Sequence, residues 1–554
     1  MRVLGVNAIY HDPAAALVVD GQVVAAAEEE RFSRRKHGKR PVPFAAWELP
    51  EAAMRWCLDA GGLRPADLDA VAYSFDPALS KPAEELGLDD PWDHLRLMYA
   101  EKAPGFLATA LPGLDRSRVR YVPHHVAHAA SAALASPHRT SSVLVLDGRG
   151  ERASHLAGRY TDGRLEVLAS QELPHSLGLV YESLTEHLGF LRSSDEFKVM
   201  ALASYGEPRF LADLREVVRT TGDGGFVAEA PDWTRWAPPR VDDGTWGGDH
   251  ADLACSLQAR LEEVLVELAR WLHERTGDRV LTMAGGTALN CVANSRVWRE
   301  AGFEEVWVQP AAGDAGTALG AALQVAADEG DAVAPMPSAA LGRSWTDDEI
   351  AGRLRLARVP FRTPPTAAAF ADEVGRVLAD DGVVAWFDGR SEYGPRALGQ
   401  RSLLAHPGHA ENLERLNDVK GREQFRPVAP MVLLDQAAEI FSDGPVPSPY
   451  MLFTHTVAET WRDRIPAAVH VDGTARIQTV DPATQPRLAA AIAAFRDRTG
   501  LPVVINTSLN TAGRPMVDDP RDALELFGSA PVDLLVLGPH LVRRGDLFAA
   551  GVPG

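Results

Sequence analysis

Two histidines with helical spacing are the sharpest chemical feature of this 554-residue sequence. His124 and His128 lie four residues apart, so on a helix both imidazoles would point the same way. Two imidazoles alone do not hold a metal ion tightly, so carboxylates would have to complete the site. Asp147 follows an apolar run, and Asp314 lies in a glycine-rich turn. Two His and two Asp would suit iron(II), manganese or zinc, although the same spacing also occurs in ordinary helices.

A second cluster of chemical interest is cationic. Residues 390–426 carry seven cations and five anions, in a chain whose formal net charge is −20. Guanidinium and ammonium groups suit phosphates and carbamate-like anions. The stretch 394–402 offers few apolar side chains for a core, which favours an anion pocket over a salt-bridged surface.

Further polar residues are expected at strand ends. Asn506 and Ser508 come after the apolar run 503–505, and His11 comes after the first apolar run of the chain. The charged run 28–37 is typical of a solvated face. The sequence lacks G-x-x-x-x-G-K-[ST], so a nucleotide would not be held by a P-loop.

The elements that would position these residues form two similar modules. Each has a buried strand, a polar turn and a hairpin, a pattern that predicts a duplicated ribonuclease-H-like, or actin-like, α/β fold. The expected strands are 3–6, 14–20 and 23–27 in the first module, and 143–146, 155–160 and 165–169 in the second. Two later strands, 280–283 and 305–308, each lead into a glycine-rich turn. Such turns approach a ligand in actin-like folds, or they only let a strand turn into a helix.

The rest of the chain suggests two domains. A Pro- and acid-rich stretch at 328–344 indicates a linker, so we predict domains at 1–335 and 346–554. Apolar residues at steps of three and four predict a helix over 251–276 that stops at Gly277. The second domain is expected to contain a helix at 346–357 and strands near 383–387, 503–505 and 533–537.

The Trp-rich stretch 226–249 is predicted to be a long surface loop. It would either pack on its own tryptophans or border the binding cleft of a bulky substrate, with Trp233 and Trp236 as candidates.

Composition excludes several protein classes. Hydrophobic residues make up 46% and charged residues 24%, an ordinary globular balance. The acidic charge argues against a general nucleic-acid binder. Three cysteines without zinc spacing indicate reduced thiols and a cytoplasmic protein. No apolar run is long enough for a signal peptide or a membrane span, so no membrane association is expected. The oligomeric state cannot be inferred.

Together these motifs resemble the O-carbamoyltransferases of antibiotic biosynthesis and nodulation-factor modification. The resemblance implies an actin-like N-terminal domain and a YrdC-like C-terminal domain. The C-terminal domain would make carbamoyl adenylate from carbamoyl phosphate and ATP, with Mg(II) accompanying ATP. The N-terminal domain would transfer the carbamoyl group to a hydroxyl of a natural product, such as an antibiotic or its sugar. The stretches that carry the resemblance are 1–12, 28–36, 124–128, 147–148, 284–290, 313–316, 394–404, 420–427 and 506–510.

The resemblance also implies roles for individual residues. The ligands of an iron(II) ion would be His124, His128, Asp147 and Asp314. The residues around ATP and carbamoyl phosphate would be Arg396, Lys420, Arg426, Arg476, Asn506 and Ser508. The adenylate-binding segment of the N-terminal domain would include Gly285, Gly286 and Asn290. His11 and Lys36 would be the catalytic residues near the transfer centre.

Two alternative functions stay open. An actin-like sugar kinase would fit the duplicated modules, but it would not explain the cationic cluster or the histidine pair. A relative of the threonylcarbamoyl transferases of tRNA modification would fit the fold, but the acidic charge argues against tRNA binding. A non-enzymatic or tRNA-directed regulator with the same fold is a related possibility. The nucleotide product separates these functions, because the carbamoyltransferase would give AMP and pyrophosphate, the kinase ADP, and the regulator no nucleotide product.

Overall fold

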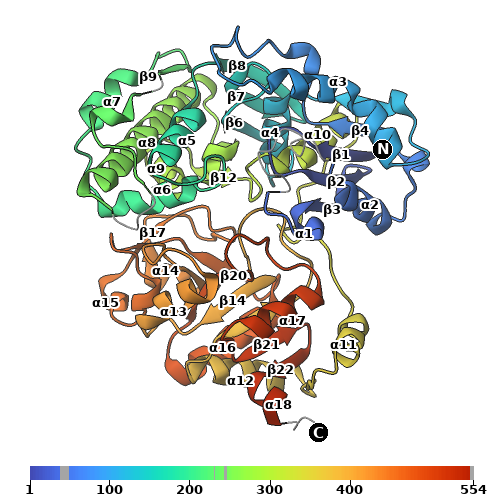
Figure 1. Cartoon of the computed structure of the whole chain (residues 1–554), viewed down its shortest axis with the longest axis vertical. Helices are drawn as coiled ribbons and strands as arrows, with labels where there is room; N and C mark the ends of the chain where they lie inside the picture. Colours follow the sequence, from blue (N-terminus) through green and yellow to red (C-terminus); the bar gives the residue numbers. More distant parts are fainter. Residues whose placement is uncertain (38–48, 230, 242–245, 550–554) are drawn as a thin grey trace. The chain divides into compact units, whose positions relative to one another are not determined.

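The computed structural model describes residues 1–37, 49–229, 231–241 and 246–549 (Figure 1). It divides into two compact units, Met1–Ala339 and Ala340–Gly554, and each is a mixed α/β structure. Within the described ranges, no helix has the length and apolar character needed to cross a membrane.

Unit 1 contains two five-stranded sheets of the same topology. In each sheet three strands form an antiparallel meander, and two further strands run parallel to the first. The shared order confirms the predicted duplication. The first sheet has the order β3-β2-β1-β4-β5, with β1 Arg2–Asn7, β2 Ala14–Val19, β3 Gln22–Glu28, β4 Ala70–Tyr73 and β5 Val119–Tyr121. The second has the order β12-β11-β6-β7-β8, with β6 Thr140–Leu146, β7 Ala153–Thr161, β8 Arg164–Glu172, β11 Val280–Ala284 and β12 Glu305–Val308.

Two helices pack against each other between these sheets. Helix α10 (Ala315–Asp328) lies on β1 and β2, and α4 (His124–Ala133) lies on β6 and β11 (Figure 1). Their approach is close, because a Cβ atom added at Gly320 of α10 would lie 1.8 Å from the Ala127 carbonyl oxygen of α4. Gly5 of β1 meets the Ala318 carbonyl of α10 in the same way. Glycine is therefore required at Gly320, where α10 meets α4, and at Gly5, where β1 meets α10.

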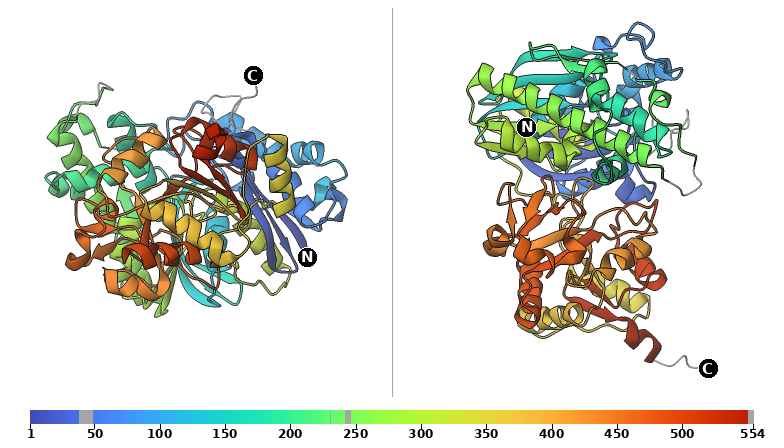
Figure 2. Two further views of the ribbon diagram at one scale, coloured as in Figure 1. Left: turned by 90° about the horizontal axis from the view of Figure 1, so that it is seen from below. Right: turned by 90° about the vertical axis from the view of Figure 1, so that its left-hand side faces the viewer.

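The remaining helices of unit 1 cover the sheets from outside. The long helix α8 packs on β6 and β7, and Figure 2 shows it among the green helices on that side of the unit. Gly277 has φ +65° and ends α8, as predicted. The outer elements are α1 Glu30–Ser33, α2 Glu51–Ala60, α3 Asp93–Ala110, α5 Leu177–His187, α6 Glu196–Leu202, α7 Leu211–Val217, α8 Gly248–Thr276 and α9 Cys291–Glu300, with a two-stranded sheet of β9 Val218–Thr220 and β10 Phe226–Ala228.

The prediction of a surface loop over 226–249 is wrong at its start. Phe226–Ala228 is strand β10, which pairs antiparallel with β9. Trp233 is buried, and its Nε1 donates to Ser183 Oγ at 3.1 Å. This packing favours the interpretation of an insertion held by its own tryptophans. Residues 230 and 242–245 of this stretch lie outside the described residues.

Unit 2 is built on a seven-stranded mixed sheet. Helices α12 and α16 pack together, and α16 lies on β15 and β20. The sheet has the order β19-β15-β20-β14-β13-β21-β22, with β13 Val384–Phe387, β14 Arg401–Ala405, β15 Ala429–Leu433, β19 Gln478–Val480, β20 Val503–Ser508, β21 Leu534–Leu537 and β22 His540–Arg543. A second sheet contains β16 Phe441–Ser442, β17 His455–Val457 and β18 Thr474–Ala475. The helices are α11 Asp347–Leu356, α12 Ala367–Ala379, α13 Glu411–Lys420, α14 Ala437–Ile440, α15 Glu459–Arg462, α16 Pro486–Thr499, α17 Pro520–Ser529 and α18 Arg544–Ala549.

Two expectations for unit 2 need correction. Asn506 and Ser508 do not follow the strand but belong to it, because β20 continues to Ser508 and pairs with β14 and β15 on either side. The stretch 394–402 is not poor in core, since Ala397 and Leu398 are buried and strand β14 begins within it. Arg401 is also fully buried, and its guanidinium donates to backbone carbonyls, including that of Asp388 at 3.0 Å. Arg401 is therefore a structural residue.

The contact between α10 and α4 can be tested with Gly320→Ala. The added methyl would force the two helices apart, so we expect the free energy of unfolding to fall by about 1–3 kcal/mol. Gly248→Ala is the matched control, because a Cβ at Gly248 meets nothing within 4 Å. Urea unfolding followed by circular dichroism measures both variants. Equal stability of the two would show that α10 approaches α4 less closely than described.

Candidate functional site

The four residues predicted as metal ligands lie together in unit 1. His124, His128, Asp147 and Asp314 each offer one ligand atom, and these atoms all lie within 4.8 Å of one another. The His124 Nε2 atom is 3.4 Å from Asp147 Oδ2 and 3.6 Å from Asp314 Oδ1. All four side chains are buried. The structure thus assembles this cluster, and metal binding by it stays a prediction.

The histidines of the cluster are positioned by the start of α4. His124 is the first residue of the helix, and its backbone N–H donates to Glu151 Oε1 at 2.7 Å. The His124 Nδ1 atom lies 3.2 Å from the Ser74 carbonyl oxygen, which requires Nδ1 to carry the proton. The Nε2 lone pair of His124 therefore faces the cluster, as expected of a metal-ligating imidazole.

The aspartates of the cluster come from two turns that follow strands, Asp147 from the turn between β6 and β7 and Asp314 from the turn between β12 and α10. Asp147 directly follows β6, and its Oδ1 accepts the Gly286 backbone N–H at 2.9 Å. Only glycine fits at Gly285, because φ is +91° and a Cβ would lie 2.2 Å from the Leu146 carbonyl oxygen. Asp314 is the residue before α10. The glycine-rich turn after β11 thus holds one of the candidate ligands in place.

The electrostatics of the cluster favour a cation at its centre. Burial alone would lower the pKa of His124 and His128, but the carboxylates of Asp147 and Asp314, whose oxygens lie 3.4–3.7 Å from the two Nε2 atoms, raise both pKa values. The Nε2 atoms of both histidines are buried and have no hydrogen-bond partner among the described residues. Unpaired buried polar atoms are costly. A divalent ion would satisfy all four groups, and two imidazoles with two carboxylates fit iron(II), manganese or zinc.

His11, the predicted catalytic residue of the N-terminus, lies beside this cluster. Its backbone N–H donates to Asp314 Oδ2 at 3.4 Å, and its Nε2 is 3.9 Å from the same oxygen. Asp12 Oδ2 lies 2.9 Å from His11 Nδ1, and Asp12 Oδ1 lies 3.0 Å from His37 Nδ1. His37 was not singled out from the sequence, because it ends a run of charges that is typical of solvated surface.

Lys36, the other predicted catalytic residue, is tied to a buried carboxylate. Its Nζ lies 3.2 Å from both carboxylate oxygens of Glu30. Glu30 and its neighbour Arg31 are buried, so the expectation of a solvated face for 28–37 is wrong there. Asp12, Glu30 and His37 form one compact cluster. Because Lys36 bonds to Glu30, this cluster brings Lys36 close to the turn that carries His11 and Asp12.

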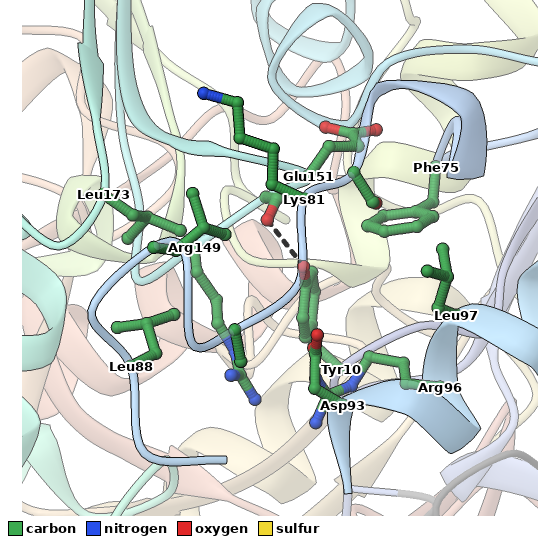
Figure 3. Close-up of a pocket in the computed structure, with 14 residues that line it drawn as sticks. Tyr10, Phe75, Lys81, Leu88, Asp93, Arg96, Leu97, Arg149, Glu151 and Leu173 are labelled. Atoms are coloured by element: carbon green, nitrogen blue, oxygen red, sulfur yellow. Dashed lines mark hydrogen bonds and ion pairs between the residues drawn. The ribbon is translucent and has the colours of Figure 1, made fainter. Parts of the chain in front are cut away.

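Figure 3 shows a small pocket lined by Tyr10, Arg96, Arg149 and other residues of unit 1. The Tyr10 hydroxyl donates to the Gly150 carbonyl at 2.7 Å, and its ring meets the His124 ring edge-on with 5.5 Å between centroids. The guanidiniums of Arg96 and Arg149 lie over the Tyr10 ring. The cavity measures about 20 Å³, room for one water-sized group. It is too small for a whole natural product.

In unit 2, two of the predicted phosphate-site residues, Lys420 and Ser508, meet at the end of α13. The Lys420 ammonium is buried and donates to the Ser508 carbonyl at 2.6 Å, to Ser508 Oγ at 2.8 Å and to Asn510 Oδ1. Asn506 lies two residues earlier on the same strand, and its Nδ2 donates to the Ala397 carbonyl at 2.8 Å. Arg396, half-buried, precedes Ala397 on that loop.

Arg426 and Arg476, two further predicted phosphate-site residues, lie near Arg422. Arg422 does not stand out in the sequence from the other cations of its stretch. Burial, and then the charges of Arg426 and Arg476, lower the pKa of Arg422 to about 9. Three guanidiniums that repel one another in this way favour a bound anion. Arg476 Nε is buried and has no hydrogen-bond partner within the described structure. Arg422 could be identified only from the tertiary structure, because that structure brings Arg476 close to Arg422 and Arg426.

Asn290, predicted to lie at the adenylate, also has a structural role. Its Oδ1 accepts the Ala293 N–H at 3.1 Å and so caps helix α9. Its Nδ2 donates to Gln258 Oε1 at 2.8 Å. A contact between Asn290 and a nucleotide stays a prediction.

Comparison with known proteins identifies relatives of the whole chain. The family model described as carbamoyltransferase N-terminus matches residues 2–85 and 95–323, and that described as carbamoyltransferase C-terminus matches residues 375–544. Nodulation protein NolNO of Sinorhizobium fredii is 37% identical over 97% of this chain and 80% of its own length. An uncharacterized protein of Synechocystis is 35% identical over 98% of this chain and 97% of its own. The solved structure of HypF from T. kodakarensis, at 14% identity, 60% and 49% coverage and a TM-score of 0.36, is too distant to support an argument.

The metal site can be tested with His128→Ala. Loss of an outer-shell partner of a metal ligand already costs about 10–100-fold in affinity, so we expect loss of a ligand to cost at least as much. Elemental analysis after anaerobic loading with iron(II), manganese or zinc measures the bound ion. His125→Ala is the matched control, because His125 is buried on the same helix but does not belong to the cluster. Undiminished metal in His128→Ala would remove the assignment.

Metal affinity should also rise with pH. The raised pKa values of His124 and His128 mean that protons occupy the cluster until the pH exceeds those values, and a metal ion must displace them. In the metal-free protein, the stability that these protons contribute is complete below the unfolded-state pKa of about 6.5 and is lost as pH rises through the folded-state values. We expect proton release on metal binding, measured by calorimetry in two buffers of different ionisation enthalpy. Binding without proton release would contradict the protonated cluster.

Proposed function

The chain belongs to the carbamoyltransferase family, and on that premise we propose that it is an ATP-dependent O-carbamoyltransferase. Family membership makes it a transferase enzyme. The observation that carries the proposal is that the two family models together match both units. In the proposed reaction, unit 2 makes carbamoyl adenylate and unit 1 transfers its carbamoyl group to the hydroxyl of a small natural product.

The first step is assigned to unit 2, which we propose to be YrdC-like. Carbamoyl phosphate loses its phosphate to water, and an oxygen of the resulting carbamate attacks the α-phosphorus of ATP. Pyrophosphate leaves, so one water, one carbamoyl phosphate and one ATP give carbamoyl adenylate, phosphate and pyrophosphate. The buried Lys420 ammonium and the Arg426 and Arg476 guanidiniums support this assignment, because cations of this kind bind phosphates. The remaining proposed contacts are Arg396, Asn506 and Ser508, with Mg(II) bound alongside ATP.

The second step is assigned to unit 1. The acceptor oxygen attacks the carbamoyl carbon, the bond from that carbon to the AMP oxygen breaks, and AMP leaves with the electron pair. Asp12 holds His11 Nδ1 and leaves Nε2 facing the site. Although burial opposes it, the charges of Asp314 and Asp12 raise the pKa of His11 to about 10. His11 would therefore take the acceptor's proton only when a divalent ion neutralises Asp314 and lowers that pKa. A divalent ion held by His124, His128, Asp147 and Asp314 would supply positive charge for the AMP phosphate and the polarised carbamoyl group. We further propose that iron(II) is that ion, that Gly285, Gly286 and Asn290 face the adenylate, and that Lys36 lies near the reacting groups.

The acceptor is proposed to be a hydroxylated small molecule, such as an antibiotic or its sugar. Membership of the carbamoyltransferase family supports a small-molecule acceptor. The net charge of −20 also disfavours a nucleic acid. A cytoplasmic location is proposed because ATP and carbamoyl phosphate are available there.

The two steps should be separable by mutation. Loss of a charge-assisted contact costs about 1.5–3 kcal/mol, so Lys420→Ala should slow pyrophosphate release from ATP and carbamoyl phosphate by about 10- to 150-fold. His128→Ala should still release pyrophosphate but yield little carbamoylated product. Arg355→Ala, an exposed arginine of unit 2, is the control and should match wild type in both assays.

A supplied intermediate makes this test sharper. Preformed carbamoyl adenylate should restore product formation in Lys420→Ala and fail to restore it in His128→Ala, with products followed by mass spectrometry. Equal loss of pyrophosphate release in both variants, or rescue of both, would exclude two separate sites. Release of ADP in place of AMP and pyrophosphate would favour a kinase.

A further inference from the structure

Two buried amide side chains in unit 2 each have an oxygen that lacks a donor. Gln478 begins β19 and Asn506 lies in β20, and their side chains are 1% and 2% exposed. Gln478 Nε2 donates to the Leu398 carbonyl at 2.8 Å, and Asn506 Nδ2 donates to the preceding carbonyl, that of Ala397, at 2.8 Å. Within the described residues, neither Gln478 Oε1 nor Asn506 Oδ1 has a hydrogen-bond partner. A buried acceptor without a donor is costly.

Both amides lie on the same face of the seven-stranded sheet. Met431 of β15 is paired with Gln478 on one side and with Val504 on the other. Paired residues share a face, and Asn506 lies two residues after Val504, so its side chain points the same way. The loop that contains Ala397 and Leu398 crosses this face.

The next residue of that loop, Gly399, shows how closely the loop approaches. At φ +93°, a Cβ at Gly399 would lie 2.5 Å from Leu488 Cδ2 and 3.5 Å from Met431 Cε. The two amides donate to consecutive carbonyls of this loop, so their unpaired oxygens lie beside the same short segment of the chain.

The groups beside these oxygens indicate what kind of donor would fit. Ser508 lies two residues after Asn506 on the same face and accepts the buried Lys420 ammonium, the group proposed to hold a phosphate. A ligand with an amino group near its phosphate would fit both features. Carbamoyl phosphate has its amino group on the carbon next to the phosphate ester oxygen, whereas the amino group of adenine is separated from its phosphates by the ribose.

We propose that Gln478 Oε1 and Asn506 Oδ1 accept the two N–H groups of the carbamoyl amino group and so select carbamoyl phosphate over acyl phosphates that lack it. This inference rests on the proposed function and adds Gln478 as a residue that determines specificity. A site built to accept an N–H rejects a ligand without it, because the buried acceptors are then left unpaired. The effect can reach about 10⁴-fold.

The experiment compares carbamoyl phosphate with acetyl phosphate, which has a methyl in place of the amino group. Both are supplied with ATP, and pyrophosphate release is measured. We expect the wild type to prefer carbamoyl phosphate by about 100-fold or more in kcat/KM. In Gln478→Met, the KM for carbamoyl phosphate should rise by about 10- to 100-fold, while the values for acetyl phosphate and ATP stay unchanged, so the preference falls.

Gln485→Met is the matched control. Gln485 Nε2 donates to the same Leu398 carbonyl, at 2.6 Å, so each variant removes one donor and leaves the other. Of these two glutamines, Gln478 alone has a buried oxygen that lacks a hydrogen-bond partner among the described residues. The control should keep the wild-type preference. Thermal unfolding and ATP affinity check that both variants are folded, and the wild-type comparison requires no variant.

The outcomes distinguish the possible errors. If wild type with carbamoyl phosphate releases no pyrophosphate from ATP, the proposed function fails. If wild type is active but uses acetyl phosphate equally well, or if Gln478→Met keeps the full preference, only the present inference is overturned, and water would then satisfy the two oxygens. A third arm compares ATP with ITP, which lacks the adenine amino group. Loss of discrimination between ATP and ITP in Gln478→Met would assign the amides to the base and overturn the carbamoyl assignment.

Discussion

Two buried carboxylates that must be neutralised are the constraint on which the architecture of unit 1 depends. Asp147 and Asp314 are removed from water, and removal of a charged carboxylate from water is expensive unless positive charge replaces the lost solvation. The imidazoles of His124 and His128 can supply that charge as protons, or they can join the carboxylates in binding a divalent ion. In either state the four groups must stay within a few ångströms of one another.

The secondary structure of unit 1 meets this demand through close packing. Asp147 follows β6, the histidines begin α4, and Asp314 precedes α10, so the cluster forms where three elements meet. Gly320 allows α10 to approach α4 closely, and the Gly286 N–H holds Asp147. Because packed helices have little freedom to shift, the fold itself holds the four candidate ligand groups in this arrangement. His11 extends the site, since the backbone of the first module's turn bonds to Asp314 of the second.

The constraint on unit 2 is different, because the protein itself must hold buried cationic and amide side chains in place. The Lys420 ammonium donates to acceptors of its own chain around Ser508, and these contacts fix its position for the proposed phosphate. Arg422, Arg426 and Arg476 are close enough to lower the pKa of Arg422. An anion with an amino group would both neutralise the like charges and donate to the unpaired oxygens of Gln478 and Asn506. This is the physical basis of the proposed selectivity.

Most elements could be predicted from the sequence, because period-two and period-3.6 patterns are local properties. The duplicated hairpin modules, the end of α8 at Gly277 and the shared helix face of His124 and His128 depend only on neighbouring residues. The family could be identified for the same reason, since its motifs are short and contiguous. Burial and hydrogen-bond satisfaction are not local, so residues such as Arg401, which is buried beneath backbone carbonyls, were assigned to the wrong class. Only the tertiary structure placed Asp12 between two histidines and left the oxygen of Gln478 without a donor, because both facts depend on segments far apart in the chain.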